Sequence, residues 1–345
     1  PPPPSPAPPS PSPPPPPSPP PPEPAAPPPP PPLPFLELVT SARKDPHLSL
    51  AHGGRADFRG QDGAVYNLLS AKNLSFAAEF EFADFVLPHK LVKGSFMRAV
   101  YIVARTWCAS SSPSYCPHWS GRPRMLHIEF NSTHLTGTAH RAVVRELGRP
   151  AVMVGGEGLH IDNVFIQTRG HQEATSVVVN TGQWRLSATA KHFPNPEANP
   201  GKMLLHVDVA ARYDADHDQV APHGLIGQSY DGDTVAVDGA QDDYRMGGDV
   251  METAAQAEGA IEGSASDYRM SHEPFSTAFR FSRFDAVRAP HRNVTALTGT
   301  KRLRTNTDGT ASTATLSPST LTAIERENAA AQAVGHAINR IHAAA

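Results

Sequence analysis

The stretches Leu126-His127-Ile128-Glu129-Phe130 and Trp184-Arg185-Leu186-Ser187-Ala188-Thr189-Ala190 decide the fold class, because apolar and polar residues alternate in both. Successive side chains of a strand point to opposite faces of the sheet, so this alternation indicates strands with one buried and one solvated face. The same pattern recurs at Leu205–Val209. We therefore predict a mainly β chain, with an antiparallel β-sandwich over residues 35–289.

Other segments of the expected sandwich are less regular. The continuous apolar runs Ala99–Val103 and Ser176–Val179 suit central strands. Residues 279–284 interleave phenylalanine with arginine and serine, which predicts a strand whose register is ambiguous. Residues 249–258 predict a short helix that ends near Gly259.

The end of the chain, residues 290–345, predicts a linker followed by a helix. Residues 290–316 are polar and rich in threonine. Ser317 can cap a helix that has Pro318 at its first position, and apolar residues then recur on one stripe. That stripe predicts packing, either on the helix's own domain or on a neighbouring subunit.

The beginning of the chain, residues 1–34, has a different composition. Twenty-five of these residues are proline. Proline fixes φ near −65° and has no N–H, and it also disfavours helix in the residue before it. The tract therefore predicts a polyproline II rod, which at ~3.1 Å per residue is roughly 100 Å long.

The overall composition excludes some classes of partner. The formal net charge is −3, which predicts no attraction to nucleic acid. No apolar run approaches the ~20 residues that a membrane-spanning helix needs. Any secretion signal would have been removed or would lie upstream of this sequence.

Cysteines and sequons bear on the compartment. Cys108 and Cys116 flank a loop rich in serine and proline, which favours a local disulfide at a hairpin tip over two free thiols. Asn73, Asn131 and Asn293 each begin an Asn-X-Ser/Thr sequon and are candidate N-glycosylation sites. These features agree with a secreted, extracellular protein.

The proline tract resembles extensin-type repeats of the hydroxyproline-rich glycoproteins of plants and green algae. The resemblance rests on Ser-Pro blocks such as Ser12–Pro17 and Ser18–Pro22. It implies hydroxylated prolines that carry glycans and serines that carry sugar, so covalent glycans are expected at Pro13, Pro14, Pro15, Pro16, Pro17, Ser18, Pro19, Pro20, Pro21 and Pro22. A linker that binds SH3 or WW modules is the alternative, although such ligands usually carry a basic residue and the only charged residue of the tract is Glu23.

Two further motifs resemble the plant root-cap family and, more distantly, von Willebrand factor type D domains. They are Asp45-Pro46-His47, followed by an Asp62-Gly63 turn, and Gly224-Leu225-Ile226-Gly227, followed by Asp231-Gly232-Asp233. The resemblance implies a structural calcium ion held by Asp62, Asp231 and Asp233. A solvated acidic turn is the alternative. Type D domains are rich in cysteine, so this chain is nearer to the root-cap branch.

These patterns predict a structural protein rather than an enzyme, because no catalytic signature such as His-Glu-X-X-His is present. We expect the glycosylated rod and the sandwich to assemble into an extracellular filament, cell-wall layer or surface layer. The expected partners are copies of itself or other hydroxyproline-rich glycoproteins. Trp107, Tyr115 and Trp119 are candidates for a groove that receives a rod, and packing in the core is the alternative for them. A carbohydrate-binding or adhesion module displayed on a stalk is the alternative.

Overall fold

The computed structural model describes residues 39–107, 121–131, 142–169, 176–192, 205–213, 220–245, 248–271 and 273–303. The chain divides into two units, Pro1–Leu36 and Glu37–Ala345, and every described residue belongs to the second. The expected rod, the Cys108–Cys116 loop and the helix after Ser317 therefore lie outside the described residues.

The first sheet has eight antiparallel strands in the order β10-β11-β12-β13-β14-β1-β2-β3. Its strands are β1 (Val39–Arg43), β2 (His47–Ser49), β3 (Arg55–Asp57), β10 (Leu159–Ile161), β11 (Val164–Arg169), β12 (Ser176–Asn180), β13 (Trp184–His192) and β14 (Leu205–Tyr213). The β13–β14 pair runs from Trp184 opposite Tyr213 to His192 opposite Leu205. β14 also pairs with β1 on its other side, so the first described strand of the chain lies in the interior of this sheet.

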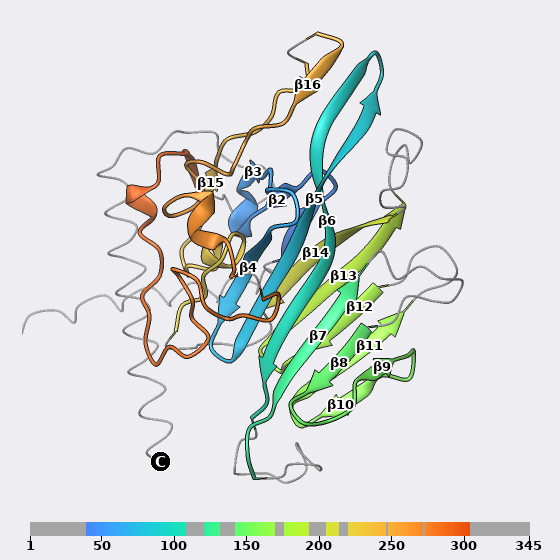
Figure 1. Cartoon of the computed structure of the whole chain (residues 1–345). Coiled ribbons are helices and arrows are strands. Elements are labelled where there is room, and N and C mark those ends of the chain that lie inside the picture. The colour runs from blue at the N-terminus through green and yellow to red at the C-terminus, as the bar shows by residue number, and fades with distance from the viewer. Residues whose placement is uncertain are drawn as a thin grey trace, which may run out of the picture. The chain divides into compact units, whose positions relative to one another are not determined.

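The second sheet has the order β4-β5-β6-β7-β8-β9, with β16 added in parallel to β6. Its strands are β4 (Val65–Ala71), β5 (Leu74–Leu87), β6 (Lys90–Arg105), β7 (Met125–Asn131), β8 (Ala142–Glu146), β9 (Val152–Val154) and β16 (Val250–Glu252). The long β5–β6 hairpin extends past the neighbouring strands, as Figure 1 shows, and turns at His89, whose φ is 64°.

The two sheets form two layers around a shared apolar core (Figure 1). The alternation predicted from the sequence is confirmed in β7, where Leu126, Ile128 and Phe130 are buried. It is also confirmed in β13, where Trp184 and the alternate residues after it are buried. The mainly β, antiparallel class is therefore confirmed for the described chain.

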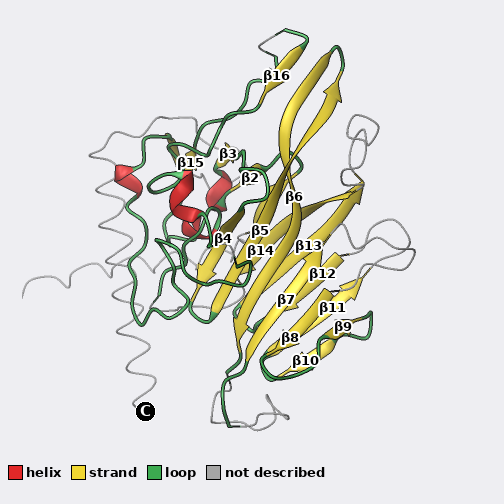
Figure 2. Cartoon of the chain, in the orientation of Figure 1, coloured by secondary structure: helices red, strands yellow, loops and turns green. Residues whose placement is uncertain are grey.

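The segment after residue 220 is mostly loop, as the secondary-structure colours of Figure 2 show. It contains a two-stranded sheet of β15 (Val235–Asp238) and β17 (Thr300–Leu303). Its short 3₁₀ helices are η4 (Gly227–Ser229), η5 (Ala265–Tyr268) and η6 (Val294–Ala296), and a further one, η1 (Ala51–Gly53), precedes β3. We expected a linker from residue 290, but Val294 and Leu297 join the core and β17 pairs with β15.

Two expected elements are absent from the described residues. The predicted helix at 249–258 is wrong: β16 pairs with Leu91–Lys93 of β6, and Gln256 forms a bridge with Phe58. The predicted strand at 279–284 is also wrong. This segment forms turns, in which the Ser282 N–H, for example, donates to the Phe279 carbonyl. Long-range pairing prevailed over local propensity in the first case, and local turns prevailed over alternation in the second.

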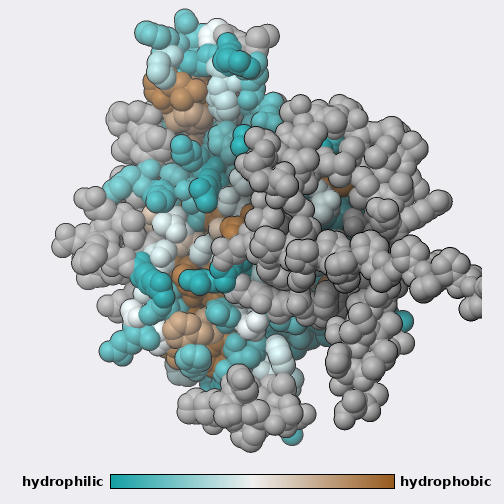
Figure 3. All heavy atoms as spheres, turned by 180° about the vertical axis from the view of Figure 1, so that it is seen from behind, coloured by the Kyte–Doolittle hydropathy of each residue, from teal (hydrophilic) through white to brown (hydrophobic). Residues whose placement is uncertain are grey.

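The surface of the described part mixes polar and apolar side chains. In Figure 3 the apolar residues form small brown patches separated by hydrophilic residues. Val86 at the end of β5 and Val250 in β16 are about half exposed, at 51% and 54%. Within the described residues, no helix has the length and apolar character needed to cross a membrane.

Candidate functional site

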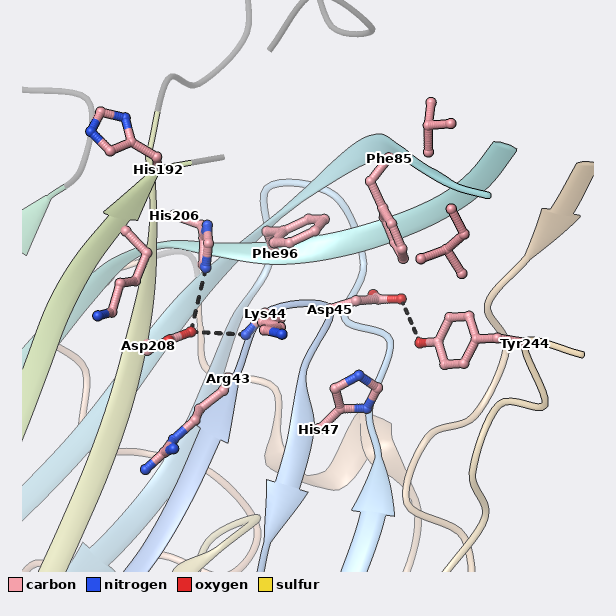
Figure 4. A pocket seen from close by; sticks show the side chains of 13 residues that line it. Arg43, Lys44, Asp45, His47, Phe85, Phe96, His192, His206, Asp208 and Tyr244 are labelled. Carbon is pink, nitrogen blue, oxygen red and sulfur yellow. Dashed lines mark hydrogen bonds and ion pairs between the residues drawn. The ribbon is translucent and has the colours of Figure 1, made fainter. Parts of the chain in front are cut away.

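A pocket of about 750 Å³ opens between the two sheets, at the end where the β5–β6 hairpin extends (Figure 4). The pocket is lined by strands of both sheets, by two residues of the β1–β2 turn and by one residue of a distant loop. Its lining residues are Arg43, Lys44, Asp45, His47, Phe85, Val86, Leu87, Phe96, Lys191, His192, His206, Asp208 and Tyr244. A volume of this size falls in the range of ligand sites in proteins. The pocket is therefore the candidate functional site.

Asp45 forms a buried anchor of the pocket, in the turn between β1 and β2. One carboxylate oxygen accepts a hydrogen bond from the Ser95 N–H at 2.9 Å, and the other accepts one from the Tyr244 hydroxyl at 3.1 Å. Burial raises the pKa of Asp45 to about 6, because the charged form loses water. The two bonds tie this turn to β6 and to the Tyr244 loop.

Asp208 forms the second carboxylate of the pocket, on β14. Its Oδ1 accepts a hydrogen bond from the Lys44 backbone N–H at 2.8 Å and lies 3.4 Å from Nε2 of His206 (Figure 4). Although burial opposes this, the hydrogen bonds lower the pKa of Asp208. Asp208 therefore stays ionised at neutral pH, and it holds Lys44 in the left-handed conformation, at a φ of 59°.

His47 lies on the same side of the pocket as Asp45. Its Nδ1 is 2.7 Å from Oδ1 of Asp57, and the two form an ion pair when the ring is protonated. This hydrogen bond raises the pKa of His47. The imidazole therefore stays protonated, and adds positive charge to the pocket, up to a higher pH than an ordinary histidine.

Three basic side chains line the pocket without direct polar contacts, although the charge of Lys191 helps to lower the pKa of Asp208. Arg43, Lys44 and Lys191 are exposed, and none donates a side-chain hydrogen bond or forms an ion pair within the described residues. The two carboxylates of the pocket, Asp45 and Asp208, by contrast accept hydrogen bonds from the backbone N–H groups of Ser95 and Lys44. The pocket thus combines an apolar lining with cations that are available to an anion.

The expected calcium residues lie elsewhere and only two of them come together. His52, Asp231 and Asp233 are buried and offer ligand atoms within 4.8 Å of one another. Asp62 is not a member of this cluster. It is exposed in the turn before β4, where its Oδ1 accepts a hydrogen bond from the Phe82 N–H at 2.8 Å.

The cluster of His52, Asp231 and Asp233 does not fit a calcium ion. Calcium prefers six to eight oxygen ligands, whereas this cluster offers an imidazole and contains the guanidinium of Arg292, whose Nε is 2.8 Å from Oδ2 of Asp231. Burial and the neighbouring Asp231 raise the pKa of Asp233 to about 8, so this carboxyl keeps its proton at neutral pH. The cluster is better described as an ion pair between Arg292 and Asp231 with a neutral neighbour.

The three sequon asparagines differ in their surroundings. Asn293 is exposed, and its Oδ1 accepts hydrogen bonds from the N–H and hydroxyl of Thr295 at 3.1 and 2.5 Å. Asn73 is half-buried in the β4–β5 turn, where its Oδ1 accepts from Arg105 at 3.3 Å. Asn131 ends β7, next to residues outside the described ranges. The cysteines and the predicted O-glycosylation sites Pro13–Pro22 also lie outside them.

The pocket residues were largely missed by sequence reasoning. Asp45 and His47 belong to the Asp-Pro-His motif, which was the one available signal. Phe85 and Phe96 lie on the β5–β6 hairpin and Tyr244 lies about 150 residues later in the chain, so no local pattern links them.

Of the aromatic residues expected to form a groove, Trp107 does not line this pocket. Trp107 is 38% exposed beyond the far end of β6, while Tyr115 and Trp119 lie outside the described residues. Comparison with known proteins finds no matching family model and no match among curated proteins.

Proposed function

We propose that this chain is a secreted structural glycoprotein that assembles into an extracellular filament, cell-wall layer or surface layer. The observation that carries the proposal is a tract with 25 prolines among residues 1–34, followed by a β domain. A rod of this kind is a poor catalyst but a good spacer and docking ligand.

Physical arguments support a role for the rod between molecules. A polyproline II segment is already extended, so its binding costs little conformational entropy. A rod of roughly 100 Å is also too long to lie on its own domain, since a 250-residue domain has a radius of gyration of only ~18 Å. The rod is therefore available to glycans, solvent or other chains.

The experiment compares three forms of the protein by electron microscopy. They are the native chain, a chain that lacks residues 1–34, and a chain in which residues 1–34 are a Gly/Ser linker of equal length. All three should fold with the same melting temperature, because the strands of both sheets lie between Val39 and Glu252 and are retained in each form. Only the native chain should form filaments or layers. Normal assemblies from either altered chain would refute the proposal.

The glycoprotein part of the proposal has its own test. Peptide mass spectrometry of native protein should find hydroxyproline with attached sugars at Pro13–Pro17 and Pro19–Pro22. An unmodified tract would contradict an extensin-like role.

The pocket supports one second candidate, a carbohydrate-binding or adhesion module on a stalk. Its volume of about 750 Å³ and its mixture of aromatic, acidic and basic residues suit a small glycan. A glycan array probed with the monomeric chain would test this role. Specific binding that is lost when pocket residues are replaced, together with an absence of assemblies, would favour the stalked module.

A further inference from the structure

We propose that the pocket between the sheets binds the acidic interruption of the proline tract, Glu23-Pro24-Ala25-Ala26, from a second copy of this chain. The inference rests on the proposed assembly for its biological setting, but it concerns a specific site and a specific segment. It is carried by the charge and lining of the pocket together with the composition of the tract.

The basic side chains of the pocket favour an anionic ligand. Arg43, Lys44 and Lys191 present three positive charges that make no ion pair within the described residues. Asp208 accepts hydrogen bonds from Lys44 N–H and faces His206, and Asp45 is held by Ser95 and Tyr244. Because Asp45 and Asp208 are already hydrogen-bonded within the protein, a carboxylate that enters the pocket can pair with the three basic side chains.

The rest of the lining is apolar, which favours a ligand with an apolar part next to its anionic group. Phe85, Leu87 and the ring of Tyr244 belong to one apolar cluster, and Val86 beside them is 51% exposed. Figure 4 shows Phe85 and Phe96 on the hairpin side, opposite Arg43, Lys44 and His47. Proline rings pack well against aromatic and aliphatic side chains of this kind.

One segment of the tract matches both requirements. Glu23 is the only charged residue among residues 1–34, and prolines lie on both sides of it. Glu23–Ala26 also interrupts the contiguous proline blocks, so it leaves a short window without the predicted glycans of Pro13–Pro22. Four extended residues span ~12 Å, which a pocket of this size can accommodate.

The occupant is more easily a neighbouring chain than the same chain. Residues 24–38 tether Glu23 to the beginning of β1 at Val39, whereas the pocket residue Arg43 lies at the other end of that strand. A rod from a second copy carries no such tether, and its binding would join copies head to tail.

The test uses the full chain carrying Glu23→Gln as receptor, so that its own tract does not compete. The probe is a synthetic peptide of residues 19–30, titrated by calorimetry at low and at physiological salt. We expect saturable one-site binding, weakened at least tenfold by Glu23→Gln in the peptide and by Lys44→Glu in the receptor. Binding should weaken at higher salt because exposed charges are screened.

A charge exchange makes the test specific. A peptide with Glu23→Lys should bind the Lys44→Glu receptor better than it binds the receptor with Lys44 intact. Lys72→Glu is the matched control, since Lys72 is exposed in the β4–β5 turn and does not line the pocket. This variant should leave the affinity for the original peptide unchanged.

Several results would overturn the inference. They are equal binding of the Glu23→Gln peptide, no effect of Lys44→Glu on peptide binding, or binding of acidic oligosaccharides to the pocket when the peptide shows no saturable binding. Such results would leave rod-dependent filaments, and hence the proposed function, intact. Conversely, filaments from the chain lacking residues 1–34 would refute the proposed function even if the peptide binds.

Discussion

Arg292 and Asp231 form an ion pair that is removed from water, with side chains 1% and 2% exposed and Nε 2.8 Å from Oδ2. The guanidinium also donates to the Ala260 carbonyl at 2.8 Å. The pair joins the loop after η4 to the segment before η6, and both segments belong to the irregular region after residue 220. Their order depends on contacts of this kind rather than on sheet hydrogen bonds.

Breaking this ion pair should destabilise the protein strongly. Arg292→Met leaves the Asp231 carboxylate buried without its partner, which typically costs about 3–5 kcal/mol. Urea unfolding should show this loss in the free energy of unfolding. The control is Arg245→Ala, which breaks an exposed pair with Asp243 and should have an effect within about 0.5 kcal/mol. Similar effects of the two variants would contradict the buried pair.

The raised pKa of Asp233 should make stability fall with increasing pH. Below the unfolded value of 3.8 both states are protonated; between 3.8 and about 8 only the unfolded state releases the proton, so the free energy of unfolding declines. The decline is at most about 1.4 kcal/mol per pH unit. In Asp233→Asn this contribution is absent, so stability should fall less steeply across the same range. Parallel pH profiles for the two proteins, measured by thermal unfolding, would show that Asp233 is ionised in the fold.

Calcium removal should leave the domain unchanged. The guanidinium of Arg292 already contacts the Asp231 carboxylate, His52 offers nitrogen rather than oxygen, and Asp62 lies outside this cluster. We therefore expect the same melting temperature with excess EGTA as with millimolar calcium. A drop in melting temperature on chelation that is abolished by Asp231→Asn would restore the predicted calcium site.

Gly94 should resist substitution because it packs against Asp45. A Cβ added to Gly94 would lie 2.8 Å from Oδ1 of Asp45, so Gly94→Ala must displace the carboxylate and its bond to Ser95. Overpacking of this kind costs about 1–3 kcal/mol. Gly155→Ala is the matched control, since nothing lies within 4 Å of its added Cβ. Equal melting temperatures for the two variants would show that the turn containing Asp45 adjusts freely.

N-glycosylation should favour Asn293 over Asn73. Asn293 is exposed, whereas Asn73 is half-buried and its sequon serine, Ser75, is buried and accepts a hydrogen bond from Asn67 at 3.0 Å. Glycopeptide mass spectrometry of secreted protein should find higher occupancy at Asn293. If Asn73 is fully occupied instead, sugar transfer must precede folding of the β4–β5 turn.

The elements that could be predicted from the sequence are those whose signal is local. Alternation in β7 and β13 reports directly which face is buried, and Ala99–Val103 reads as a central strand because both of its faces are covered. The helix predicted at 249–258 failed because Val250–Glu252 pairs with a strand about 160 residues earlier in the chain. No local pattern records such a pairing.

The site was harder to predict for the same reason. The pocket brings together Asp45, Phe96, Asp208 and Tyr244, which lie far apart in the sequence and meet only when the two sheets stack. The acidic turn at Asp231 was visible in the sequence, but its neighbours His52 and Arg292 were not. His52 and Arg292 lie beside the Asp231 carboxylate, and the positive charge of Arg292 balances its negative charge.

The parallel strand β16 has a consequence for how copies of this protein can join. β7 pairs with β6 only from Ala99 to Arg105, so the hairpin half of β6 would otherwise offer free N–H and C=O groups at an open edge. β16 occupies that edge at Leu91–Lys93. A strand of a second molecule would have to displace β16 before it could pair at Leu91–Lys93, so this stretch of the hairpin is closed to the sheet extension that leads to amyloid-like aggregates.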